Sequence, residues 1–188
     1  MRFLVALGLA GLLAACATPR PTVQLTPLPV LAHDTPWSLQ GRIALKAGEN
    51  SMSGQLQWQH RSNHEELLLL SPLGQGMARI VSDSEGVLLE MPNQAPRRAP
   101  DAESLTREAL GVALPLSGLS HWMLGRPDPA RPSEQSLDSA GRVAQIRQDG
   151  WVIDYLQYMP EPAARPRKLN VVREGLEIRL VIDTWKTE

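Results

Sequence analysis

The fold of this chain is decided by residues 37–46, which read WSLQGRIALK. The odd positions are apolar apart from one glycine: Trp37, Leu39, Gly41, Ile43 and Leu45. Most positions between them are polar, and this period of two indicates a strand with one apolar face. Residues 52–59 continue the alternation after a turn at 48–50, so the two segments predict a β-hairpin.

Strand patterns continue on both sides of a helical stretch. Strands are expected at 67–70, 77–81, 86–91, 142–148, 151–158, 168–173 and 176–185. Asp101 is expected to cap a helix that ends at Gly111, and a second short helix is expected from about Pro115 to a stop at Gly125. Residues 126–140, rich in Pro and Ser, are expected to form a loop. The order predicts a mainly β protein, in which a helical insert packs on a curved or barrel-like antiparallel sheet.

The first 36 residues read as a signal and a tether. Arg2 precedes an apolar run that ends in Leu13-Ala14-Ala15 before Cys16, the only cysteine. This pattern predicts a cleaved bacterial lipoprotein signal over 1–15 and lipidation of Cys16. The alternative is an ordinary secretory peptide with an incidental cysteine. Residues 16–36 are expected to form a lipid-anchored, Pro-rich tether, and 37–188 a single domain. In bacteria that sort lipoproteins by the residue after the cysteine, aspartate at that position mainly retains them in the inner membrane. Because Ala17 stands there, we expect this protein at the outer membrane.

Composition and motifs argue against several functions. The net charge of −1 does not suggest nucleic-acid binding, and one cysteine excludes an intramolecular disulfide. The chain has no G-x-S-x-G, H-E-x-x-H or Gly-rich phosphate loop, so no enzyme, cofactor or metal is expected. We expect His60, His64 and the pair Glu65-Glu66 to lie at a solvated turn, and His121 to be a surface or lid residue.

The four residues Ser71-Pro72-Leu73-Gly74 follow a run of four leucines. Proline and glycine favour a tight turn, which would hold Leu73 at its tip. Either Leu73 folds back into the core, or it projects as an apolar wedge suited to a bilayer interface.

Seven segments in order resemble the LolB family, the outer-membrane lipoprotein receptors of Gram-negative bacteria. They are the lipobox ending at Cys16, Gly41-Arg42-Ile43-Ala44, Gly54-Gln55-Leu56-Gln57-Trp58, Ser71-Pro72-Leu73-Gly74, Leu114-Pro115-Leu116 with Leu119 to Gly125, Gly150-Trp151, and Ile182-Asp183-Thr184-Trp185. The resemblance implies an incompletely closed antiparallel β-barrel with short helices as a lid over a hydrophobic cavity. It also implies that a LolA-like periplasmic chaperone delivers acylated lipoprotein cargo, which the receptor inserts into outer-membrane phospholipid without a cofactor. The protein is expected to act as a monomer.

The resemblance also suggests residue roles. The membrane-insertion loop falls on Pro72, Leu73 and Gly74. Candidate cavity and lid residues are Leu39, Ile43, Leu56, Trp58, Leu116, Leu119, Trp122, Met123, Trp151, Ile178, Leu180 and Trp185. Taken without the family, the helical residues of this set read as ordinary core. Two other functions stay open: a lipid-binding module of the same architecture, and a structural envelope lipoprotein with a solid core.

Overall fold

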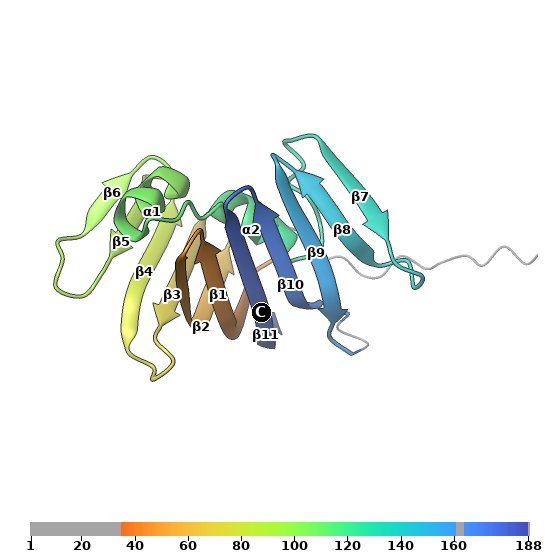
Figure 1. Cartoon of the computed structure of the whole chain (residues 1–188), viewed down its shortest axis with the longest axis horizontal. Helices are drawn as coiled ribbons and strands as arrows, with labels where there is room; N and C mark the ends of the chain where they lie inside the picture. The colour runs from red at the N-terminus through yellow and green to blue at the C-terminus, as the bar shows by residue number, and fades with distance from the viewer. Residues whose placement is uncertain (1–34, 161–163, 188) are drawn as a thin grey trace, which may run out of the picture.

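The computed structural model describes residues 35–160 and 164–187, whose strands form one open antiparallel sheet (Figure 1). The signal, Cys16 and most of the tether lie outside these described residues. The strands are β1 (Trp37–Ala47), β2 (Asn50–Arg61), β3 (His64–Leu70), β4 (Gly76–Asp83), β5 (Gly86–Glu90), β6 (Arg97–Ala99), β7 (Ser133–Leu137), β8 (Val143–Gln148), β9 (Trp151–Tyr158), β10 (Pro166–Arg173) and β11 (Leu176–Thr187). The expected mainly β, incompletely closed architecture is confirmed.

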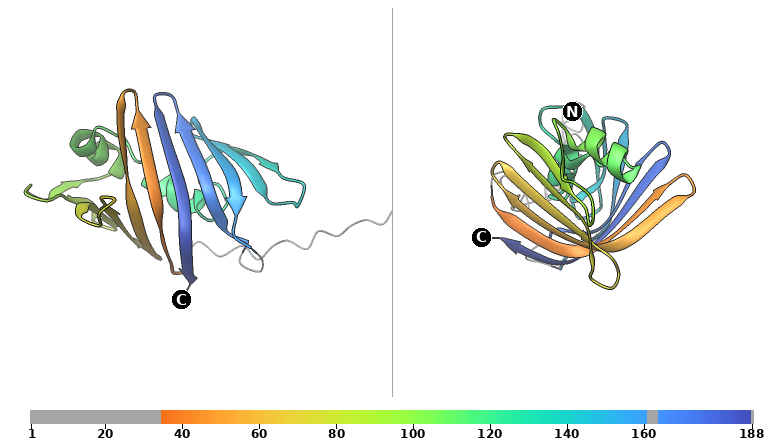
Figure 2. Two further views of the ribbon diagram at one scale, coloured as in Figure 1. Left: turned by 60° about the horizontal axis from the view of Figure 1, so that its bottom comes forward. Right: turned by 90° about the vertical axis from the view of Figure 1, so that its left-hand side faces the viewer.

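The sheet consists of two meanders joined through the first and last strands. Its order is β6-β5-β4-β3-β2-β1-β11-β10-β9-β8-β7, so every neighbour is consecutive in the chain except β1 and β11. The edge strands are β6 and β7, and residues 100–132 connect them. Both helices, α1 (Ala102–Leu110) and α2 (Leu116–Trp122), lie in this connection. Figure 2 shows them within the curve of the sheet, over its concave face.

Alternation along the strands makes the concave face apolar. In β1 the buried residues are the odd positions from Trp37 to Leu45, and Ile43 pairs with Leu180 of β11. The same alternation in the other long strands brings their apolar side chains into one core. Burial of this face supplies the main driving force for folding.

The first helix ends where its sequence signals predict. The Ser104 backbone N–H donates to the Asp101 carboxylate at 2.8 Å, and Gly111 has a left-handed φ of 72° at the other end. Hydrogen bonding to Ser104 lowers the pKa of the Asp101 carboxyl, which therefore stays charged at the helix N-terminus. The second helix begins after Pro115, as expected, and ends at Trp122, three residues before Gly125.

Two edge strands and one buried histidine differ from the sequence expectations. Strand β7 lies inside the segment 126–140 expected to be a loop; its residues are all exposed, so they carry no apolar period. Strand β6, with three residues, is too short for periodicity to find. His60 is buried rather than solvated, because it continues the inward register of Leu56 and Trp58 along β2.

Two glycines allow the central strands to approach closely. A Cβ at Gly54 would overlap the Leu70 carbonyl oxygen, and one at Gly41 would overlap the Val181 carbonyl oxygen. The β1–β11 pairing also shifts register between Gln40 and Gly41. These contacts permit the sheet to curl tightly around its core.

We predict that Gly54→Ala destabilises the protein by about 1–3 kcal/mol, the usual cost of forcing extra atoms into a packed site. The matched control is Gly76→Ala, because nothing lies within 4 Å of a Cβ built at that strand residue. Urea unfolding of the two variants measures the difference. Equal midpoints would show that close approach at Gly54 is not required for the curl.

Candidate functional site

The second helix seals the concave face with apolar side chains. Leu116, Leu119, Trp122 and the following Met123 are all buried. The Trp122 ring packs 6.0 Å from the ring of Trp151 in β9, measured between centroids. This helix therefore covers the apolar interior of the half-barrel.

Polar contacts hold α2 to strands β8 and β9. The Tyr155 hydroxyl donates to the Trp122 carbonyl oxygen at 2.7 Å, and Trp122 Nε1 donates to Gln148 Oε1 at 2.9 Å. Burial raises the pKa of the Tyr155 hydroxyl well above its ordinary value, so it remains a neutral donor. Gln148 Oε1 also accepts from the Asp128 backbone N–H, and Nε2 donates to the carbonyl oxygens of Asp128 and Arg131. The buried amide thus fixes both the helix and the loop that follows it.

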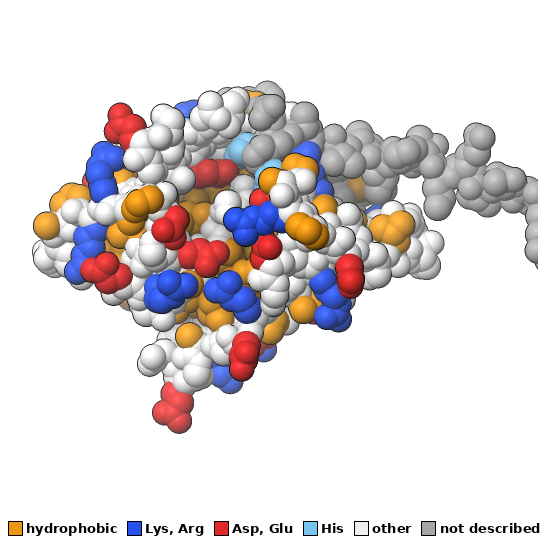
Figure 3. All heavy atoms as spheres, turned by 90° about the horizontal axis from the view of Figure 1, so that it is seen from above, with side chains coloured by type: hydrophobic (Ala, Val, Ile, Leu, Met, Phe, Trp, Pro, Cys, Tyr) orange, Lys and Arg blue, Asp and Glu red, His pale blue; other side chains and the backbone are white. Residues whose placement is uncertain are grey.

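An ion pair connects the first helix to the opposite meander. Glu103 Oε2 of α1 lies 3.7 Å from Arg173 Nη2 of β10, whereas the body of α1 contacts β5 and β6. The Arg173 guanidinium also lies 4.3 Å from the centroid of the Trp151 ring. The pair therefore bridges the mouth of the half-barrel. Seen from above, hydrophobic side chains are visible between acidic and basic ones (Figure 3).

The candidate cavity and lid residues share one core. Eleven of the twelve are buried, with exposed fractions of 7% or less, and Trp185 is partly buried against them. The structure therefore places these side chains together but packed, with α2 over them. Their role in taking up acyl chains stays a prediction, and it requires α2 to move away from the sheet.

An aromatic cluster at one end of the half-barrel was not expected from the sequence. The Trp37 ring packs 5.3 Å from those of Trp58 and Trp185, and 5.0 Å from the stacked His60 ring. Glu65 accepts from Trp58 Nε1, and one of its oxygens lies 2.6 Å from His60 Nδ1. Glu65 is thus a structural partner and not a residue of a solvated turn. The period of β2 carries the signal for His60.

The loop between β3 and β4 holds Leu73 away from the core. The Ser71 backbone N–H donates to the Gln75 carbonyl oxygen at 2.7 Å, and that of Gly74 donates to the Ser71 carbonyl oxygen at 2.8 Å. Gly74 has a φ of 82°, which favours glycine. Leu73 is 89% exposed, so it does not fold back into the interior.

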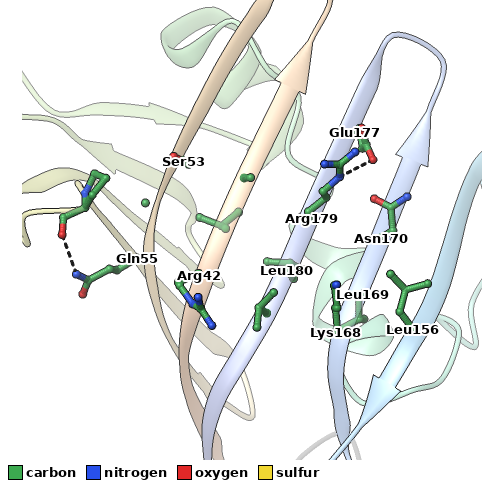
Figure 4. Close-up of a pocket in the computed structure, with 15 residues that line it drawn as sticks. Arg42, Ser53, Gln55, Leu156, Lys168, Leu169, Asn170, Glu177, Arg179 and Leu180 are labelled. Atoms are coloured by element: carbon green, nitrogen blue, oxygen red, sulfur yellow. Dashed lines mark hydrogen bonds and ion pairs between the residues drawn. The ribbon is translucent and has the colours of Figure 1, made fainter.

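A groove of about 760 Å³ lies on the outer face of the central strands (Figure 4). It is lined mostly by outward residues of β2, β1, β11 and β10, together with Pro72 and with Leu156 of β9. Arg42, Lys168 and Arg179 are among them. Outward strand positions read as solvated in the sequence, so no binding role was predicted for these three cations.

The fold defines the chain as an open antiparallel half-barrel with helices over an apolar concave face. A LolA superfamily protein from Nitrosomonas europaea shares this fold, with a TM-score of 0.54 and 11% identity over 85% of this chain and 89% of that one. A DUF1329 family protein from Desulfovibrio piger aligns with a TM-score of 0.53 and 8% identity over 82% of this chain and 86% of that one. These likenesses concern architecture alone.

Sequence comparison gives the family. The family model described as "Outer membrane lipoprotein LolB" matches residues 35–185. The "Outer-membrane lipoprotein LolB" of Thiobacillus denitrificans is 52% identical over 99% of this chain and 98% of its own length. The protein of the same description from Nitrosomonas europaea is 37% identical over 97% and 91%. The chain therefore belongs to the LolB family of outer-membrane lipoproteins, and its expected localisation at the outer membrane is confirmed.

We predict that Tyr155→Phe loosens α2, because it leaves the Trp122 carbonyl oxygen without this donor. The cost of such a loss is about 1–2 kcal/mol. Hydrogen exchange of the backbone amides in 116–123 should become faster.

The matched control is Tyr158→Phe, which also removes a 2.7 Å bond to a carbonyl oxygen, here that of Val143 in β8. It should leave exchange in 116–123 unchanged. Equal acceleration in both variants would mean that Tyr155 contributes to general stability and does not secure the helix.

Proposed function

We propose that this protein is the receptor that accepts acylated lipoproteins from a LolA-like periplasmic chaperone and inserts them into the outer membrane. The observation that carries the proposal is the continuous apolar concave face under α2, in a member of the LolB family. The proposed transfer uses no catalysis, nucleotide or cofactor.

The physical requirement for such a receptor is a removable apolar enclosure. Burial of an acyl chain is worth about 0.8 kcal/mol per CH₂, so a chain of roughly 15 methylenes gains about 12 kcal/mol. A cavity has to supply this burial in water and still bind the chains less tightly than the bilayer does. Leu, Ile, Met and Trp side chains of the concave face provide contacts without directional requirements, which suits cargo of varied sequence.

The closed arrangement supports a lid that opens when cargo enters. Separation of α2 from the sheet breaks the Tyr155 and Trp122 hydrogen bonds and exposes the apolar side chains that the helix buries. Incoming acyl chains can offset this cost because they bury the same apolar surface of the sheet. When empty, the packed helix prevents exposure of a large apolar patch. We propose that acyl chains replace α2 against Trp151, Ile178 and Leu180 of the sheet.

In this proposal the lipid on Cys16 and the Leu73 loop place the receptor at the membrane. Residues 1–15 are removed as a signal, lipidated Cys16 holds the body at the membrane, and residues 17–36 act as its tether. The domain from 37 to 188 receives cargo as a monomer. The exposed Leu73 then enters the lipid interface while acyl chains leave the cavity; Pro72 and Gly74 hold it there.

We predict that a Cys16→Ala chain that begins at residue 16, and therefore has neither the signal nor the lipid, still accepts an acylated lipoprotein from LolA in solution. Co-purification of the cargo with this variant measures the handover. The cargo should elute without free phospholipid. Phospholipid or glycolipid as the copurifying species, with no cargo uptake, would favour a lipid-binding module instead.

We also predict that Leu73→Glu preserves cargo binding but lowers insertion into vesicles by tenfold or more, because a charged side chain cannot enter the apolar interface. The control is Leu137→Glu, since Leu137 is an exposed leucine of edge strand β7, at 62%. It should insert cargo normally. Loss of both cargo binding and insertion in Leu73→Glu would contradict a separate membrane step at this loop.

A further inference from the structure

The outer groove places basic side chains on both sides of a small apolar floor. Arg42 of β1 and Lys168 of β10 both pair with Val181 of β11, from opposite sides, so the three residues form one row across the sheet. Neighbouring strands lie about 4.8 Å apart, which puts the backbones of Arg42 and Lys168 roughly 10 Å from each other. All three side chains belong to the outward face, which Figure 4 shows for the two cations.

The pairs two residues along β11 from Val181 add a third cation, Arg179, and short side chains that leave the groove open. Arg179 pairs with Ala44 on one side and Asn170 on the other. Ala44 and Val181 are short side chains between long ones, so they leave the hollow of about 760 Å³. Among the lining residues there are three cations and one acid, Glu177, which gives the groove a positive balance.

The ion pairs in the groove are exposed enough to exchange partners. Arg42 Nη2 lies 3.1 Å from Asp183 Oδ1, and Arg179 Nε lies 2.8 Å from Glu177 Oε1. Both arginines are more than 60% exposed, and such surface pairs are worth about 0–1 kcal/mol. An incoming phosphate, which forms charge-assisted bonds with guanidinium groups, can compete with these carboxylates.

The groove is also continuous with the Leu73 loop. Pro72 lines it, and Gln55 Nε2 donates to the Pro72 carbonyl oxygen at 3.4 Å, so the base of the loop rests on the groove wall. On the opposite side the groove is bounded by Leu156, which is 59% exposed. The surface therefore combines cations with exposed apolar side chains, as an amphiphile requires.

We propose that this groove is a binding site for the phosphate of a membrane phospholipid headgroup. Lys168 and Arg42 bind the phosphate, Arg179 adds a third positive charge, and Leu156 and Pro72 contact the glycerol and upper acyl region. The occupant is a lipid in the bilayer because this outer-membrane lipoprotein is held at a phospholipid surface. The inference deepens the proposed function and rests on it only for placing the Leu73 loop at the same bilayer.

The test measures vesicle binding by the Cys16→Ala chain that begins at residue 16 and has no signal, with no cargo or chaperone present. Vesicles of phosphatidylethanolamine and phosphatidylglycerol are compared with vesicles of a neutral galactolipid, which has no phosphate. The groove variant is Arg42→Gln with Lys168→Gln. Binding to the phospholipid vesicles should fall about thirty-fold, since each cation near an anionic surface contributes roughly 1 kcal/mol. Binding to galactolipid should not change.

The matched control is Lys46→Gln with Arg147→Gln. It removes one lysine and one arginine that are exposed on the same outer face but do not line the groove. Unfolding midpoints verify that both double variants fold.

Equal losses of phospholipid binding in the two double variants would overturn the proposal in favour of diffuse electrostatic attraction. Unchanged phospholipid binding in the groove variant would also overturn it. A variant that binds vesicles normally but fails to receive cargo would show that the groove docks a protein. Because cargo is absent from the vesicle assay, failure of the receptor function leaves its result intact.

Discussion

The structure depends on the burial of one face of an open sheet. The long strands of the sheet alternate apolar and polar side chains, and most of their apolar side chains are buried in one core on the concave side. An open sheet cannot bury that face against itself unless it curls, and residues such as Gly54 and Gly41 permit the close strand approach that curling needs. The opening that remains on the concave side is covered by α1 and α2 (Figure 2). The proposed uptake of acyl chains depends on how that cover is attached.

The attachment of the cover is a consequence of topology. Because β1 pairs with β11, the middle of the chain falls at the two edges of the sheet, and the connection between β6 and β7 has to cross from one edge to the other. The helices in that connection lie over the concave face (Figure 2). They are secured by a few directed contacts, Tyr155 to Trp122, Gln148 to Trp122, and Glu103 to Arg173. The cover is otherwise held by apolar packing, which the proposed acyl chains would replace with contacts of the same polarity. No external energy source is needed if each successive apolar environment binds the chains more tightly.

The two faces of the sheet have different tasks in this view. The concave face is apolar and suits the proposed exchange of acyl chains, whereas the outer face carries Arg42, Lys168 and Arg179 around a shallow groove. The Leu73 loop adjoins the groove, since Pro72 lines the groove and the next residue, Leu73, is exposed. Placing the cations and the exposed leucine on one continuous surface would orient the half-barrel on a membrane. Orientation matters because acyl chains have to leave the cavity next to the bilayer.

The sequence by itself determined the mainly β class, the hairpins, the first helix with its caps at Asp101 and Gly111, and the family. Those features depend on local periodicity, helix capping and turn chemistry, which are set by residues close together in the chain. It did not indicate β7, because an edge strand paired on one side needs no apolar period, nor the contacts of His60 with Glu65 and Trp37. Only the tertiary structure decided that β1 pairs with β11, that the helices therefore cross the concave face, and that Arg42 and Lys168 meet across Val181. Each of these arrangements joins residues far apart in the chain, and long-range pairing leaves no mark in the local pattern of either partner.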